Sequence, residues 1–102
     1  LDPWHPAVVR GAAGLHFALP VLACALDEVT GPVLALDADG DRLGEVPDDA
    51  ALVVGSERAG VSAAVRARAD AVVSLPMRPG VSSLNLATAV SAALYAWRLR
   101  RP

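Results

Sequence analysis

The chain has 102 residues, 54% of them hydrophobic, and a formal net charge of −2 at pH 7. This length is enough for one small domain, and the abundance of Ala, Val and Leu is typical of an α/β domain packed with small aliphatic side chains. The net charge excludes a strong overall attraction for nucleic acid, so any RNA contact has to come from a local patch or from a segment outside this chain.

The cysteine content, the apolar runs and the first residue limit the cellular setting of the protein. Cys24 is the only cysteine, which excludes an intrachain disulfide and fits a reducing cytoplasm. The longest apolar runs are shorter than a bilayer span and no signal peptide is visible, so we expect a cytoplasmic protein without membrane segments. Because the chain begins with Leu1 rather than Met, we expect it to be part of a longer protein.

The first half of the chain predicts two helices and one strand. After an extended proline-rich start, residues 7–13 predict a short helix that the following glycine ends. Residues 20–29 predict a second helix, with proline in its first turn and a Gly-Pro pair after its end. The apolar run 33–36 predicts a buried strand, and the polar stretch 37–49 predicts a loop with at most one helical turn.

The second half alternates strands with helices. Residues 51–54 predict a buried strand, Ser62 is a good N-cap for a helix to about Arg68, and residues 71–75 predict a third strand. Ser82 or Ser83 caps a final helix that runs to about Arg98. Since each crossover helix returns the chain to the same edge, the strands should pair in parallel. The fold class is therefore α/β, a mostly parallel sheet with flanking helices.

The final helix has two faces that could pack. One face is apolar with helical spacing and consists of Leu86, Ala89, Val90, Ala93, Leu94 and Trp97. The other carries mostly small residues, namely Leu84, Ala87, Thr88, Ser91 and Tyr95. The pattern fits an ordinary core helix, and it fits equally a helix between its own sheet and a second subunit. From the second alternative we expect a homodimer.

A glycine-rich segment with one carboxylate follows the strand 51–54. It reads Gly55-Ser56-Glu57, with Gly60 closing a tight turn into the next helix. Ligands of parallel sheets bind at the carboxyl ends of strands, and Gly55 would let the backbone approach such a ligand. The helix dipole stabilises the negative charge of Glu57 beside the start of that helix. The alternative is a strand–turn–helix joint whose glycines serve only the bend.

A second polar segment follows the next strand. Leu75-Pro76-Met77 ends that strand, Pro79-Gly80 forces a turn, and Ser83-Leu84-Asn85 opens the final helix. Proline supplies no donor, which leaves neighbouring backbone groups free to face a ligand, and the first turn of a helix adds outward-pointing N–H groups. Ser83 and Asn85 could also be simple helix caps. Two such segments side by side predict a ligand-binding crevice.

The two segments resemble the second and third signature motifs of the SpoU (TrmH-type) class of the SPOUT superfamily. Those enzymes transfer a methyl group from S-adenosylmethionine to a ribose 2′-hydroxyl of ribosomal or transfer RNA. The resemblance implies a cofactor site made of Gly55, Glu57, Gly60, Leu75, Met77 and Leu84. It implies catalytic-site positions at Glu57, Ser83 and Asn85. It also implies a SPOUT-like fold with a C-terminal trefoil knot.

One family motif has no counterpart in the chain. The family's Asn-x-Gly…Arg-Thr-Ala segment, which carries its catalytic arginine, is absent, and the stretch around Arg10 resembles a different, later family segment. Residues 1–102 therefore resemble the C-terminal part of a SPOUT methyltransferase domain. We expect this chain alone to be inactive. The alternative function is that of a degenerate, non-catalytic module for cofactor binding or dimerisation.

Metal sites receive little support from the sequence. The run from Asp37 to Asp41 is similar to a calcium loop, but Arg42 stands where such a loop needs glycine and Asp48 where it needs glutamate. The two histidines and the cysteine lack the spacing of a zinc site. We therefore expect S-adenosylmethionine as the cofactor and no metal.

Overall fold

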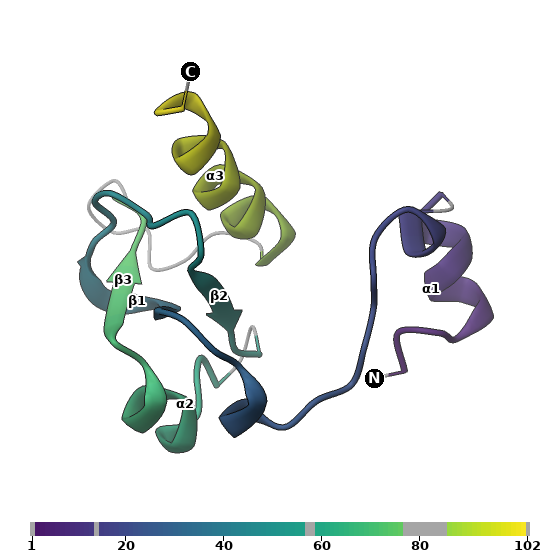
Figure 1. The fold of residues 1–102 in the computed structure, drawn as a ribbon, viewed down its shortest axis with the longest axis horizontal. Helices are drawn as coiled ribbons and strands as arrows, with labels where there is room; N and C mark the ends of the chain where they lie inside the picture. The colour runs from purple at the N-terminus through teal and green to yellow at the C-terminus, as the bar shows by residue number, and fades with distance from the viewer. Residues whose placement is uncertain (1, 14, 57–58, 77–85, 102) are drawn as a thin grey trace.

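A three-stranded parallel sheet forms the centre of the computed structural model, which describes residues 2–13, 15–56, 59–76 and 86–101 (Figure 1). Its strands are β1 (Val33–Arg42), β2 (Ala51–Val54) and β3 (Ala71–Ser74), in the order β2-β1-β3. All pairings are parallel, as the alternation of strands and helices predicts. The bounds predicted for β2 are confirmed, and β3 ends one residue earlier than expected.

The first half of β1 is the most buried part of the sheet. Val33 and Ala35 are fully buried and Leu34 nearly so. A central strand of a parallel sheet is covered on both faces, which is why this run carries no alternating polar residues. Leu34 also belongs to the core cluster with Val46 and Val73. The strand 33–36 is therefore confirmed as a buried strand.

The prediction that residues 37–49 form a loop is wrong for the first six of them. β1 continues to Arg42 through an irregularity, since Leu36 and Asp41 both pair with Val73. A Cβ atom at Gly40 would lie 2.6 Å from the backbone of Val72, so glycine allows β1 to approach β3 closely there. Ser74 Oγ donates to the Gly40 carbonyl at 2.8 Å and stabilises this continuation.

Two predicted helices flank the sheet. Helix α2 spans Ala63–Arg68, and Ser62 is its N-cap, because the Ser62 hydroxyl accepts from the Val65 N–H at 3.2 Å. Helix α3 spans Leu86–Leu99, so its end agrees with the prediction. The predicted caps of α3, Ser82 and Ser83, lie outside the described residues.

Aromatic and charged side chains fasten the end of α3 to the segment between β1 and β2. Trp97 donates its indole N–H to Asp48 at 3.0 Å, and Arg101 is paired with the same carboxylate. Arg101 also donates to the carbonyl of Val46 at 2.6 Å, and its guanidinium lies 5.2 Å from the centre of the Trp97 ring. These contacts hold α3 against the loop that carries the core residue Val46.

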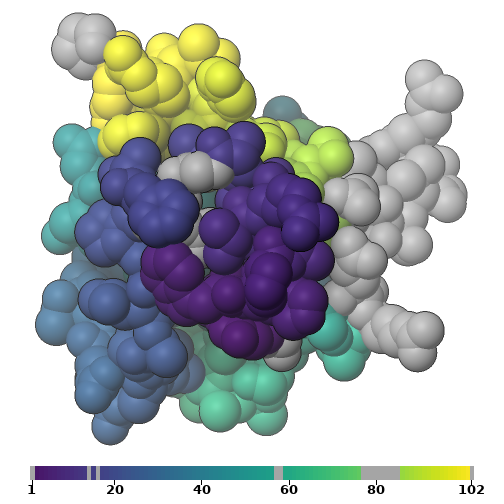
Figure 2. All heavy atoms as spheres, turned by 90° about the vertical axis from the view of Figure 1, so that its right-hand side faces the viewer, coloured from purple at the N-terminus to yellow at the C-terminus, as the bar shows by residue number. Residues whose placement is uncertain are grey.

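The N-terminal segment, residues 2–13 and 15–25, stands apart from the sheet (Figure 1). It contains helix α1 (Pro6–Gly11) and a 3-10 turn at Leu15–Phe17, and it forms the near face of the molecule in Figure 2. The predicted helix 7–13 is confirmed, although α1 lies slightly earlier. Ala13, just after this helix, has φ 53°, a left-handed conformation that is uncommon for a residue other than glycine.

The predicted helix over residues 20–29 is wrong. Only Leu26–Glu28 is helical, as a short 3-10 turn, and residues 20–25 have no regular structure. Leu19 and Leu22 remain 66% and 83% exposed, so the segment finds no surface in the described chain on which to bury an apolar face. A helix this short needs tertiary packing for stability, because its own hydrogen bonds do not offset the cost of starting it.

Candidate functional site

The three strands are in register near one edge of the sheet. Leu36 of β1 pairs with Val54 of β2 and with Val73 of β3. The residues that follow these three, Asp37, Gly55 and Ser74, therefore lie at the same level: β2 has ended, β3 ends at Ser74, and β1 continues through its irregularity to Arg42. The sequence suggested that the segments after β2 and β3 lie side by side. Because β1 lies in the middle of the sheet, they flank it at this edge and do not adjoin each other. This carboxyl edge is where parallel sheets bind ligands.

The segment after β2 folds back on itself. The N–H of Gly60 donates to the carbonyl of Ser56 at 2.9 Å, and the Ser56 hydroxyl accepts from the N–H of Ala59 at 2.9 Å. Ser56 and Gly60 form an isolated antiparallel bridge. Gly60 has φ +68°, a conformation that glycine adopts without strain. The tight turn predicted at Gly60 is thus confirmed; we call the described residues 55–56 and 59–61 the glycine loop.

The glycine at position 55 has a different role from the one expected. A Cβ atom there would overlap the carbonyl group of Gly60 and lie 2.5 Å from the nitrogen of Val61. The returning backbone of the glycine loop therefore fills the space beside Gly55. From the sequence, a ligand was expected in this space. Glycine is required here so that the loop can close.

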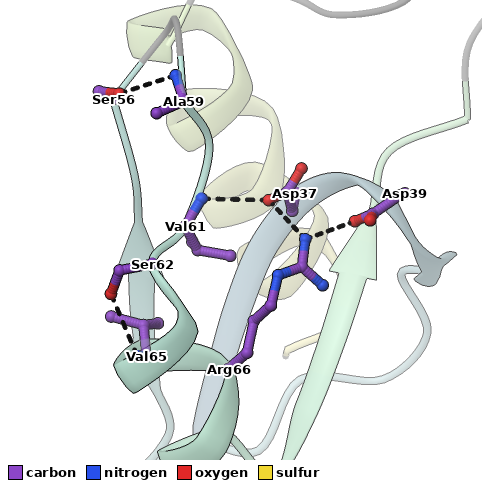
Figure 3. A network of polar contacts seen from close by, with 8 residues as sticks. All are labelled: Asp37, Asp39, Ser56, Ala59, Val61, Ser62, Val65 and Arg66. Atoms are coloured by element: carbon purple, nitrogen blue, oxygen red, sulfur yellow. Dashed lines mark hydrogen bonds and ion pairs between the residues drawn. The ribbon is translucent and has the colours of Figure 1, made fainter.

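Asp37, in the middle of β1, connects this strand to the glycine loop (Figure 3). Its Oδ2 atom accepts from the N–H of Val61 at 3.1 Å and from the guanidinium of Arg66 at 2.9 Å. Arg66 also donates to Asp39 at 2.8 Å, so one arginine of α2 pairs with two carboxylates of β1. The Val61 N–H, and with it the charge of Arg66, holds the pKa of Asp37 below its ordinary value, although burial opposes this.

Asp37 was not among the site residues expected from the sequence, where it belonged only to a rejected calcium loop. A signal was available, because Asp37 is the first polar residue after the buried strand 33–36, as Gly55 is the first residue after the strand 51–54. In the structure Asp37 and Asp39 are partners of Arg66. Within the described ranges, no group of three or more His, Cys, Asp or Glu side chains could hold a metal ion.

The expected site residues divide into two groups. Gly55, Gly60 and Leu75 are described, and the structure places Gly55 after β2 and Leu75 after β3, on either side of β1, with Leu75 half-buried. The others lie outside the described residues: Glu57, Met77, Ser83, Leu84 and Asn85. In the part of the chain that the structure describes, no helix is long and apolar enough to cross a membrane.

Comparison with known proteins decides the family. The sequence model of the SpoU rRNA Methylase family matches residues 1–95. The chain belongs to this family. The crystal structure of the SpoU methyltransferase AviRb from Streptomyces viridochromogenes, in complex with the cofactor AdoMet, superposes with a TM-score of 0.81 at 34% identity. That match covers 98% of this chain and 46% of AviRb.

Curated relatives extend the comparison to named RNA substrates. The 23S rRNA (adenosine(1067)-2'-O)-methyltransferase of Streptomyces azureus is 34% identical over 97 residues, which cover 84% of this chain and 36% of the relative. The tRNA (cytidine(34)-2'-O)-methyltransferase of Beijerinckia indica is 52% identical over 48 residues, 47% of this chain and 29% of the relative. Each match thus spans about a third of the relative's own length.

Proposed function

We propose that this chain is the cofactor-binding part of an S-adenosylmethionine-dependent methyltransferase that modifies a ribose 2′-hydroxyl in ribosomal or transfer RNA. The observation that carries the proposal is the glycine loop at the carboxyl edge of the sheet, in a chain of the SpoU family. The SpoU methyltransferase AviRb, whose fold matches, was crystallised with AdoMet. The named relatives that methylate 23S rRNA and tRNA support the substrate class.

The described residues fit a cofactor that is recognised mainly by main-chain groups. Gly55 and Gly60 place no side chain at the edge, Ser56 is exposed there, and Leu75 offers an apolar contact beyond β3. When bound, S-adenosylmethionine supplies the methyl group for the reaction. In this proposal Gly55, Gly60 and Leu75 share the cofactor site with Glu57, Met77 and Leu84, named here from the family resemblance.

Glu57, Ser83 and Asn85 are the proposed catalytic-site residues, again from the resemblance. A ribose hydroxyl is too weak an acid to lose its proton unaided near neutral pH, so transfer requires a group that accepts or polarises this proton and an aligned substrate. The family's arginine motif, which has this task, has no counterpart in the 102 residues. We therefore propose that the chain binds the cofactor but needs a further segment for turnover.

The proposed protein is a cytoplasmic homodimer with a C-terminal knot. The homodimer stays part of the proposal from the two-faced pattern of α3; in the single chain Leu94, Tyr95 and Leu99 of this helix are 49%, 67% and 80% exposed, so a second subunit would have to cover them. The family resemblance supports a C-terminal trefoil knot as part of the proposal. A cytoplasmic location fits the single cysteine, Cys24, and an RNA substrate.

Titration calorimetry with S-adenosylhomocysteine tests the proposal on the 102-residue chain. We expect saturable heat with one site per chain, with the fold verified by circular dichroism. A folded chain that gives no heat contradicts the proposal. A second measurement separates the methyltransferase from the non-catalytic module. It follows the transfer of tritiated methyl groups to ribosomal and transfer RNA, both for the chain and for a longer protein that contains the arginine motif. Binding without turnover in both proteins favours the non-catalytic module.

A further inference from the structure

A single carboxylate oxygen holds both the return of the glycine loop and the helix that follows it. Asp37 Oδ2 accepts from the Val61 N–H at 3.1 Å and from Arg66 of α2 at 2.9 Å (Figure 3). The same oxygen lies against Gly60, since a Cβ atom there would be 2.6 Å from it. Gly60 in turn occupies the space beside Gly55. The middle of β1 is thus connected through the loop to the end of β2.

Burial and charge make the contact between the Asp37 carboxylate and the Val61 N–H important for the loop backbone. Val61 is 6% exposed, so its N–H would lose a partner in a buried position if the carboxylate were removed. The Asp37 side chain is 16% exposed, compared with 68% for Asp39, which shares Arg66. Hydrogen bonds to a charged acceptor are shorter and stronger than neutral ones. Asp37 is therefore the main carboxylate anchor of the loop, whereas the solvent-exposed Asp39 only provides a second partner for Arg66.

We propose that Asp37 is a positioning residue of the cofactor site, which fixes the glycine loop in its binding conformation before the cofactor arrives. It acts through Gly60 and Val61, and Arg66 keeps its carboxylate aimed at them. A loop that is already ordered loses less affinity to conformational entropy on binding. The inference rests on the proposed function, since it assumes that this edge of the sheet binds S-adenosylmethionine.

The chain contains a matched control at the opposite end of the sheet. Asp70 Oδ2 accepts from the N–H of Val33 at 2.8 Å and pairs with Arg68 at 3.5 Å. Asp70 precedes β3 and Val33 begins β1, so this contact lies at the amino edge, away from the glycine loop. Val33 is fully buried. Asp70→Ala therefore removes the same kind of carboxylate–backbone contact without touching the proposed site.

Three variants of the 102-residue chain separate positioning from general stability: Asp37→Ala, Asp37→Asn and Asp70→Ala. Calorimetry measures S-adenosylhomocysteine affinity, and thermal unfolding measures stability. We expect Asp37→Ala to weaken binding about tenfold or more. Asp37→Asn should weaken it less, because its amide oxygen still accepts from Val61 while the ion pair with Arg66 is lost. Asp70→Ala should lower the melting temperature but keep affinity within about twofold of the wild-type chain.

Amide hydrogen exchange at Val61, followed by NMR, gives a readout that does not depend on the cofactor. We expect exchange at Val61 to become faster in Asp37→Ala and to stay slow in Asp70→Ala. Wild-type affinity in folded Asp37→Ala, unchanged protection of Val61, or equal loss of affinity in Asp70→Ala would overturn the positioning role. If Asp37→Ala does not fold, Asp37→Asn with unchanged affinity overturns it. A wild-type chain that binds no S-adenosylhomocysteine contradicts the proposed function, and Val61 exchange then still decides whether Asp37 holds the loop.

Discussion

We call residues 33–56 and 59–76 the sheet unit. The sheet unit and the N-terminal segment are both rich in apolar residues, but they differ in what those residues contact. In the sheet unit, Val33, Leu34, Ala35 and Val73 are buried. In the N-terminal segment the large apolar side chains are 46–83% exposed: Trp4, Leu15, Phe17, Leu19 and Leu22. Apolar content alone therefore does not determine packing. A segment folds into a core where the chain also provides a surface that covers it.

The described residues of the proposed site lie in the packed part. Gly55, Gly60 and Asp37 are held by the sheet and by α2, whereas α1 contains no buried residue. Substitutions of one residue type should therefore have very different effects in the two regions. Variants made in pairs, one in each region, therefore test whether this difference in packing holds in solution.

The largest difference is expected between two glycine substitutions. Gly55→Ala places a Cβ atom onto the backbone of Gly60, which cannot rotate away as a side chain could, so the glycine loop has to open. Gly11→Ala, at the end of α1, has no atom within 4 Å of its new Cβ. Calorimetry should show that Gly55→Ala abolishes S-adenosylhomocysteine binding and that Gly11→Ala preserves it. Wild-type binding by Gly55→Ala would show that the loop has another conformation in solution.

A second pair compares leucine in the core with leucine at the surface. Leu34 is 8% exposed and belongs to the core cluster, whereas Leu22 is 83% exposed. Leu34→Ala should reduce the free energy of unfolding by about 2–5 kcal/mol, because it leaves a cavity between β1 and its neighbours. Leu22→Ala should change it by less than about 0.5 kcal/mol. Urea denaturation measures both, and similar losses would mean that the N-terminal segment packs in solution.

The sequence predicts the sheet well, because its strands are short apolar runs bounded by Gly, Pro and charged residues. The residue pattern predicts the parallel pairing and the strand Ala51–Val54, and Ser62 correctly marks the start of α2. The helix expected over residues 20–29 does not form, because apolar spacing predicts which face would be buried but not whether a partner surface is present. The continuation of β1 to Arg42 depends on the close approach of Gly40 to β3, which is a tertiary contact.

The site is only partly predictable for a related reason. Motif resemblance indicates the glycine loop and the segment after β3, and their positions at one edge follow from parallel pairing. The role of Gly55 in closing the loop and the role of Asp37 both depend on contacts across 5 to 24 positions of the chain. The position of Asp37 directly after a buried strand was a signal, but its contact with Val61 forms only where β1 lies beside the glycine loop, which is a tertiary arrangement.

The smallest expected effect concerns acid stability within the packed part. The Val61 N–H and Arg66 lower the pKa of Asp37, and hydrogen bonds from Arg101 and Trp97 lower the pKa of Asp48. A carboxylate with a lowered pKa in the folded state contributes stability above its ordinary value of 3.8, and this contribution is lost as the pH falls through the folded-state value. The wild-type chain should therefore lose stability below about pH 4.

Replacing the two carboxylates tests this dependence. Urea denaturation of Asp37→Asn, Asp48→Asn and the double variant, between about pH 6 and about pH 2, should show a shallower loss of stability in each single variant and the shallowest in the double variant. Because Asp37 holds the glycine loop and Asp48 holds α3, the two contributions should add. If Asp37→Asn keeps the wild-type acid dependence, the contacts with Val61 and Arg66 do not stabilise the Asp37 carboxylate in solution. The inference that Asp37 anchors the glycine loop to β1 is then wrong.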